Sequence, residues 1–270
     1  MNKSDGRTYM NNHWSYVEDS LKIRINAHNR YAKFDIDTWI LNKIDLKGDE
    51  RLLDLCCGNG KQSLKYAKIL SGKGDVDAMD ISKELLNEAR AIAELQNVNI
   101  NYHCQDINEK LPFKNNSFDI VTCAFGIYYV QNVSEVISEI FRVLKPGGKF
   151  FVVGPTENNA REMLDLYEEV THKKISQKRE KRMEYEIIPK IKNIFDKVEI
   201  EIFKNSLEFP SVKEFIKYTC ATLSFKENTD EKIKEDVLKR IEEKAYEKKK
   251  PSEGFILTKE VYGLLAHKGK

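Results

Sequence analysis

Short apolar runs alternate with amphipathic helical patterns through the middle of the chain, from Glu50 to about Val153. The runs have the length of buried strands, and the segments between them carry apolar side chains at helical spacing. Strands separated by helices pair in parallel, because a parallel neighbour requires a long crossover. The pattern predicts strands over Arg51–Leu55, Asp75–Asp80, Ile100–His103, Phe118–Ala124 and Lys149–Val153, and helices over Lys61–Leu70, Lys83–Leu95 (N-capped by Ser82) and Val133–Leu144.

The flanking segments have a different pattern. Residues 1–48 are rich in aromatic side chains and are predicted to form a helical N-terminal cap on the core, residues 49–155. The C-terminal part, residues 156–270, is predicted to complete the sheet. Its elements are a charged helical stretch (Asn158–Lys192), a strand (Lys197–Lys204), two helices forming a lid (211–249) and a closing strand (Glu260–Ala266), with a turn at Lys145–Gly148 before the fifth strand. The apolar face of the lid, which includes Phe215 and Tyr218, is equally consistent with ordinary core packing.

Composition narrows the class of protein. The 270 residues are 41% hydrophobic and carry a net charge of +2, so no strong field marks a nucleic-acid binder. The sequence has no apolar run of about 18 residues, and its N-terminus lacks the apolar core of a signal peptide, so we expect no membrane span. The five cysteines include no CxxC pair. Free thiols in the cytoplasm are therefore expected, with no metal site and no disulfide framework.

A glycine turn follows the first predicted strand. Gly58 and Gly60 stand between this strand and a helix, where the backbone can approach a ligand closely. A dinucleotide site needs a third glycine three residues later, and Ser63 stands there instead. Asp54 at the strand end would also repel a pyrophosphate and favour a ligand with a sulfonium or ammonium group. The signs of charge therefore favour S-adenosylmethionine over NAD.

Two further acidic residues end the next two strands. Asp80 is placed to accept hydrogen bonds from ribose hydroxyls, although it could instead cap the following helix. Asp106 is placed to accept from an adenine amino group, with Ile81 and Ile107 enclosing the ring. Acids at the carboxyl ends of three successive parallel strands converge on one crevice, which is where ligands bind in open α/β sheets.

Three blocks with matching spacing carry a family resemblance. Leu53–Gly60 resembles the Asp/Glu-x-Gly-x-Gly-x-Gly motif of class I S-adenosylmethionine-dependent methyltransferases, Leu111–Val121 their "LPF…NSFDxV" stretch, and Arg142–Gly148 their "RVLKPGG" turn. The resemblance spans roughly residues 50 to 155. It implies a Rossmann-like, doubly wound, mostly parallel seven-stranded sheet with an antiparallel last strand.

By this resemblance the cofactor is S-adenosylmethionine, and S-adenosylhomocysteine is the product. Its implied contacts are Asp54, Cys56, Gly58, Gly60, Asp80, Ile81, Asp106, Ile107, Ala124 and Phe125. Cys56 departs from the family pattern, which has glycine there. A small side chain fits at that position if its backbone angles stay ordinary.

The acceptor is not specified by these motifs. Tyr128 and Tyr129 lie just past the fourth strand, and either could contact the acceptor or pack at a helix start, while His13 is a candidate base in the N-terminal segment. Phe125-Gly126-Ile127 is similar to the ubiquinone/menaquinone-biosynthesis C-methyltransferases, but Tyr128-Tyr129 replaces the Arg-Asn of that group. A small-molecule acceptor is expected. The alternatives are an RNA or protein methyltransferase using a basic helix at 172–182, and an NAD(P)-dependent oxidoreductase.

Overall fold

The computed structural model describes residues 14–70, 73–248 and 254–270. The chain forms two compact units that interleave along the sequence. The helical unit consists of the described residues within 1–35, 157–178 and 204–260, and the sheet unit of those within 36–156, 179–203 and 261–270. Two long strands, β6 (Lys197–Phe209) and β7 (Phe255–His267), contribute residues to both units.

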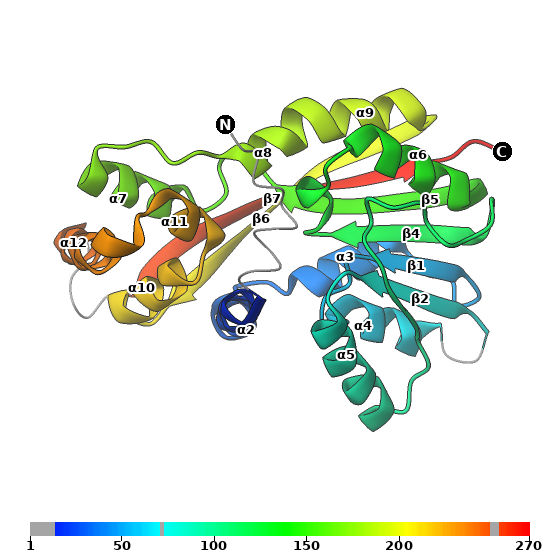
Figure 1. Cartoon of the computed structure of the whole chain (residues 1–270), viewed down its shortest axis with the longest axis horizontal. Helices are drawn as coiled ribbons and strands as arrows, with labels where there is room; N and C mark the ends of the chain where they lie inside the picture. The colour runs from blue at the N-terminus through cyan, green and yellow to red at the C-terminus, as the bar shows by residue number, and fades with distance from the viewer. Residues whose placement is uncertain (1–13, 71–72, 249–253) are drawn as a thin grey trace. The chain divides into compact units, whose positions relative to one another are not determined.

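The sheet has seven strands in the order β3-β2-β1-β4-β5-β7-β6 (Figure 1). The strands β1 to β5 pair in parallel with their neighbours in this order, and β7 is antiparallel to β5. This arrangement confirms the predicted doubly wound sheet. The order of the strands reverses between β1 and β4, so the ligand crevice is expected at their carboxyl ends. The first five strands are β1 (Arg51–Leu55), β2 (Asp75–Asp80), β3 (Asn101–Cys104), β4 (Phe118–Ala124) and β5 (Leu144–Pro155).

Alternation along the strands divides the sheet unit into two cores. Leu52 and Ile120 pack with α3 (Ile36–Ile44) and α4 (Lys61–Ile69) on one face. Their chain neighbours, Leu53 and Val121, pack on the other face. Successive side chains of a strand point to opposite faces, so nearly continuous apolar runs can fill both cores. The face that carries Leu53 and Val121 is covered by α6 (Val133–Val143) and α9 (Ile188–Ile194). On the other face, α5 (Lys83–Leu95) lies on the same side as α4 (Figure 1).

Several strands differ from the predicted bounds. β3 is shifted by one residue, and β5 begins at Leu144 because the predicted turn at Lys145–Gly148 is an irregularity within the strand. Phe118 pairs with Leu144 and Ile120 with Lys149, so the extra residues bulge out, and the amide of Gly147 donates to the carbonyl of Lys268. β6 and β7 are both longer than predicted. β7 runs through Gly263, where a Cβ would lie 2.3 Å from the Trp39 ring, so glycine serves side-chain packing at this position.

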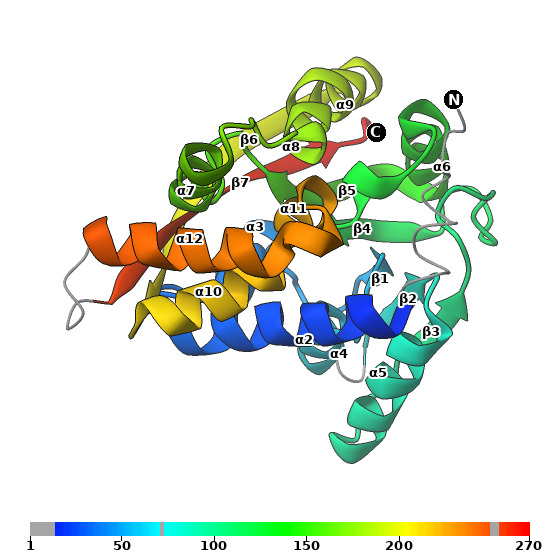
Figure 2. The same ribbon diagram turned by 60° about the vertical axis from the view of Figure 1, so that its left-hand side comes forward.

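The helical unit has its own apolar core. It is built mainly by α2 (Trp14–Tyr31), α7 (Arg161–Thr171), α10 (Val212–Cys220) and α12 (Lys234–Lys248), and Figure 2 shows α2, α10 and α12 side by side. Residues 211–249, expected as two helices, also contain α11 (Leu223–Asn228) and a short 3₁₀ turn. Phe215 and Tyr218 are buried in this core, and Phe215 stacks on Phe255. The apolar face of the predicted lid is therefore core.

The predicted basic helix at 172–182 is largely wrong. α7 ends at Thr171 because His172 adopts a left-handed conformation with φ of 56°, and no helix forms again until α8 (Lys178–Arg182). A π-helical turn, Met183–Ile187, joins α8 to α9. Among the described residues, no helix is both long and apolar enough to span a bilayer.

Candidate cofactor site

The glycine turn after β1 adopts left-handed backbone angles, with φ of 56° at Gly58 and 75° at Gly60. These angles favour glycine because they have no steric cost without a Cβ. The two glycines differ in their surroundings. A Cβ on Gly58 would meet nothing within 4 Å, whereas one on Gly60 would lie 2.9 Å from the Cβ of Ala89 on α5. Gly58 therefore offers open backbone to a ligand, while Gly60 allows close packing of the turn against α5.

Cys56 does not have ordinary backbone angles. Its φ is 56°, in the left-handed region that costs a side-chain-bearing residue about 1–2 kcal/mol. Its side chain lies against Gly126, where a Cβ would come within 2.3 Å of the Cys56 Cβ and 3.3 Å of the Cys123 Sγ. A hydrogen bond with Cys123 and burial raise the pKa of the Cys56 thiol well above its usual range. The thiol is therefore protonated at neutral pH and is not a nucleophile.

Asp54 lies beneath the turn. Its carboxylate accepts hydrogen bonds from the hydroxyl of Ser63 on α4 and from that of Thr122 on β4, the latter at 2.7 Å. The residue is 2% exposed, and this burial raises its pKa to about 6 against the opposing effect of the two hydroxyls. Asp54 thus links α4 to β4 below the turn. It also places a buried carboxylate near the strand ends.

Asp80 connects the turn to the end of β2. One carboxylate oxygen accepts from the amide of Gly58 at 2.8 Å, and the other accepts from the amide of Ser82 at 2.9 Å. Burial raises the pKa of Asp80, while these amides lower it. The predicted N-cap is confirmed, since the Ser82 hydroxyl accepts from the Leu85 amide at 3.1 Å. Asp80 is therefore not the cap. The adjacent Ile81 is 39% exposed and provides an apolar surface beside the carboxylate.

Asp106 and Ile107 follow β3 and are both buried. One oxygen of Asp106 accepts from the backbone amide of Asn108 at 2.9 Å and from its side-chain amide at 2.7 Å. Ile107 packs in the core on the α6 face of the sheet. The loop therefore presents a fixed carboxylate at the end of β3, next to the strand that ends in Asp80.

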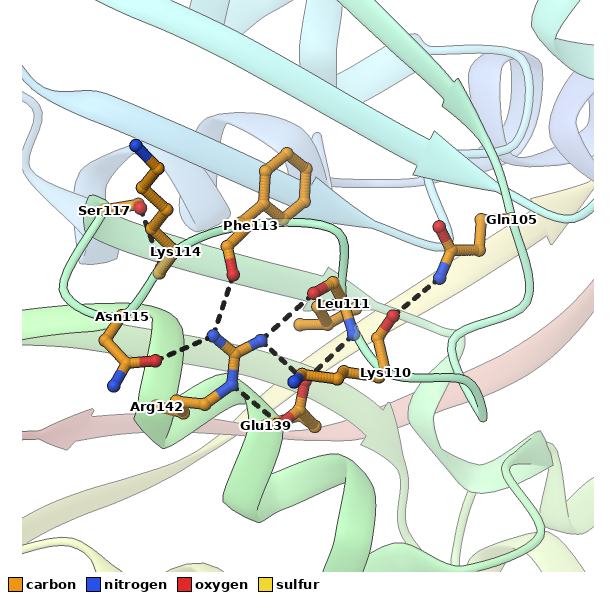
Figure 3. Close-up of polar contacts among 9 residues, drawn as sticks. All are labelled: Gln105, Lys110, Leu111, Phe113, Lys114, Asn115, Ser117, Glu139 and Arg142. Carbon is orange, nitrogen blue, oxygen red and sulfur yellow. Dashed lines mark hydrogen bonds and ion pairs between the residues drawn. The ribbon is translucent and has the colours of Figure 1, made fainter.

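The loop from Gln105 to Ser117 is held at several points (Figure 3). The side-chain amide of Gln105 donates to the carbonyl of Lys110 at 2.8 Å. The Arg142 guanidinium, on α6, donates to the carbonyls of Leu111 and Phe113 and pairs with Glu139, which in turn accepts from the Leu111 amide at 2.9 Å. Two of the motif blocks are thus joined by one arginine, and they fix the loop that carries Asp106.

The end of β4 is strained and leads into a short 3₁₀ turn, Ile127–Tyr129. Ala124 ends the strand, and Phe125 has φ of 63°, an outlier for a bulky residue, held by a bond from its amide to the Val153 carbonyl. Tyr128 is buried in the core, whereas Tyr129 is 45% exposed. Cys56 and Phe125 thus place left-handed, non-glycine backbone at the ends of the two strands between which the sheet order reverses. Such strain clusters at functional sites.

The candidate base predicted in the N-terminal segment, His13, lies outside the described residues. Among the described residues, no group of three or more metal-ligating side chains is close enough to hold an ion. Four supports of the site were not found from the sequence: Ser63, Thr122, Asn108 and Arg182. Their side-chain bonds depend on the folded arrangement, whether the partner is near in the chain, as Asp106 is to Asn108, or far from it, as Asp54 is from Thr122. Only the position of Ser63 was singled out, as the place of a missing glycine.

Comparisons with known proteins agree with the methyltransferase resemblance of the motifs. Residues 17–202 match the ubiE/COQ5 methyltransferase family. The ubiquinone/menaquinone biosynthesis C-methyltransferase UbiE of Shewanella pealeana is 37% identical over 145 residues, which cover 52% of this chain and 55% of that protein. The demethylmenaquinone methyltransferase of Lactiplantibacillus plantarum is 37% identical over 128 residues, covering 47% of this chain and 52% of that protein. The chain thus spans about half the length of the curated relatives it matches.

A solved structure of phosphoethanolamine N-methyltransferase 2 from Haemonchus contortus, in complex with S-adenosyl-L-methionine, shares the fold, with a TM-score of 0.53 and 20% identity over 87% of this chain and 52% of that one. Strand order, glycine turn and strand-end carboxylates together define a Rossmann-like fold of the methyltransferase type. The chain belongs to the ubiE/COQ5 methyltransferase family.

Proposed function

We propose that this protein transfers a methyl group from S-adenosylmethionine to a small-molecule acceptor. The observation that carries the proposal is Asp80, which links the Gly58 amide to the end of β2 beside an exposed Ile81. This places a carboxylate, open backbone and an apolar side chain together at the point where ligands bind in such sheets. The relatives named above as methyltransferases support the same activity.

The residues present fit the cofactor. Open space beside Gly58 admits a ligand against the backbone, and the buried charge of Asp54 favours a positively charged sulfur over a pyrophosphate. We assign the ribose hydroxyls to Asp80, the adenine amino group to Asp106, and the faces of the ring to Ile81 and Ile107. Cys56, Gly60, Ala124 and Phe125 would border the methionine end through their backbone and small side-chain atoms.

When bound, S-adenosylmethionine supplies a methyl group already activated by its sulfonium. The chain therefore mainly has to orient the two reactants and exclude water. The strained ends of β1 and β4 fix the backbone where the methyl group would be presented. Tyr129, exposed beyond β4, is the better candidate for contact with the acceptor, because Tyr128 is committed to the core. The free thiols of Cys56 and Cys57 have raised pKa values and take no nucleophilic part.

The other functions have less support. The basic segment at 172–182 forms only the five-residue α8, and the guanidinium of Arg182 is bound by backbone carbonyls. The basic helix available to RNA or protein is therefore much shorter than expected, and one of its charges is already engaged. Family membership argues against an NAD(P)-dependent oxidoreductase. Quinone precursors are the first acceptors to test, given the names of the relatives, and Tyr128-Tyr129 would then have to serve in place of Arg-Asn. Free thiols at all five cysteines suit the cytoplasmic location that we propose.

Calorimetry with S-adenosylmethionine and S-adenosylhomocysteine tests the cofactor assignment, and dissociation constants in the micromolar range are expected. Transfer of labelled methyl groups to small molecules from a cell extract, followed by mass analysis, tests the acceptor class. Asp80→Asn tests the ribose assignment, and it should weaken binding of the cofactor. Asp75→Asn is its matched control, because Asp75 is exposed at the start of the same strand that ends in Asp80. If neither cofactor form binds, the proposed function is wrong.

A further inference from the structure

The segment after β4 is fixed by side chains from distant parts of the sheet unit. We call residues 127–131 the tyrosine turn, because it carries Tyr128 and Tyr129. Its 3₁₀ helix ends at Tyr129, and Val130 is extended, with ψ of 151°. Carbonyls beyond the helix end lack helical partners and must be satisfied in another way.

Arg182 supplies donors on one side of the tyrosine turn. Its guanidinium donates to the carbonyls of Tyr128 at 3.3 Å, of Gln131 at 3.1 Å, and of Val130. Its Nε donates to Glu186 at 2.8 Å, which orients the group. A planar fork with five N–H donors can serve several carbonyls at once, and a lysine ammonium cannot reproduce this geometry.

Asn108 holds the same turn from the adenine loop, residues 105–110. Its side-chain oxygen accepts from the Gln131 amide at 2.6 Å, and its side-chain nitrogen donates to Asp106 at 2.7 Å. Gln131 is therefore the shared point: its N–H is bound by Asn108 and its carbonyl by Arg182.

We propose that Arg182 and Asn108 are positioning residues that clamp the tyrosine turn between α8 and the adenine loop. The clamp holds the Asp106 carboxylate, which is assigned to adenine, and the two tyrosines after β4 in fixed positions relative to one another. Its consequence for methyl transfer rests on the proposed function, whereas its effect on the turn does not.

Amide hydrogen exchange and calorimetry on the full chain test the clamp. Asn108→Ala should speed exchange of the Gln131 amide by about tenfold or more and weaken S-adenosylmethionine several-fold, because Asp106 loses a donor. Arg182→Lys should speed exchange of the Tyr129 and Val130 amides. It should also lower kcat about tenfold or more for methyl transfer to the acceptor found with the labelled cell extract, with the cofactor dissociation constant nearly unchanged. Lys181→Gln, on the same helix and exposed, is the matched control and should change none of these values.

The outcomes separate the clamp from the function. Exchange in Asn108→Ala and Arg182→Lys equal to that in Lys181→Gln would overturn the proposal, as would full recovery of wild-type exchange and kcat by lysine at position 182. Failure of the proposed function shows up differently, as no cofactor binding by the wild-type chain, and leaves the exchange result to decide the clamp.

Discussion

Cys56 and Gly126 are fitted to each other across the ends of β1 and β4. Cys56 has left-handed backbone angles, and its Cβ lies 2.3 Å from where a Cβ on Gly126 would be. Gly126 itself has φ of −119°, which any residue adopts, so glycine is needed there for space and not for its conformational freedom. The side chain that replaces the family glycine at position 56 thus requires a glycine at position 126.

Gly126→Ala should therefore destabilise the protein through overpacking. We expect a loss of about 1–3 kcal/mol in the free energy of unfolding, measured by urea titration with circular dichroism. Cys56→Gly removes both the clashing side chain and the left-handed strain. The double variant Cys56→Gly/Gly126→Ala should therefore recover most of the loss. Losses that simply add in the double variant would contradict the fit between the two residues.

Arg142 should hold the loop from Leu111 to Asn115 by the shape of its guanidinium more than by its charge (Figure 3). Arg142→Lys keeps a positive charge beside Glu139 but gives up most of the carbonyl bonds. We expect it to lose about 1–3 kcal/mol of unfolding free energy, nearly as much as Arg142→Gln. Urea unfolding of both variants measures this. Full stability of the lysine variant would show that the ion pair alone holds the loop.

The sequence was sufficient for the sheet and for the positions of the strand-end acids. Buried runs such as Leu52-Leu53 fill both faces of a parallel sheet, so their pattern and the intervening helices predict parallel pairing. The number of strands and the antiparallel last strand were implied by the family resemblance. Boundaries failed where tertiary pairing overrides local signals. Pro146 and the glycines after it indicate a turn locally, but pairing with β4 absorbs them as an irregularity inside β5.

The site was less predictable than the fold. Asp54 and Asp80 were located from their positions at strand ends, but not their partners. Asp54 bonds to Thr122, 68 residues away, and Asp80 to Gly58, 22 residues away. Such contacts depend on side-chain direction in the folded sheet, which no local pattern encodes. The left-handed angles of Cys56 were also missed, because non-glycine residues rarely adopt them.

The pH dependence of stability should carry the signature of Asp54. Its pKa is about 6 in the folded chain and 3.8 ordinarily, so the folded state holds the proton more tightly than the unfolded state. Stability attributable to this group is therefore full below pH 4 and is lost as pH rises to about 6, by roughly 3 kcal/mol in total. Asp54→Asn lacks this change. The free energy of unfolding of Asp54→Asn minus that of wild type should therefore increase between pH 4 and pH 7 in urea titrations, and a constant difference would contradict a raised pKa.

Asp80 should serve the fold and the cofactor together, and substitution should separate the two roles. Asp80→Asn keeps one oxygen acceptor for the amides of Gly58 and Ser82 but places an NH₂ group against the other, so a loss of about 1–2 kcal/mol of unfolding free energy is expected. Loss of a charged acceptor for the ribose hydroxyls should weaken S-adenosylmethionine by about ten- to a hundredfold. Calorimetry at a temperature well below the unfolding transition measures the affinity of the folded fraction. Asp75→Asn, in the same strand and exposed, should change neither quantity. Reduced stability with unchanged affinity would leave Asp80 a purely structural link between the turn and β2, and the ribose would then have to be held elsewhere.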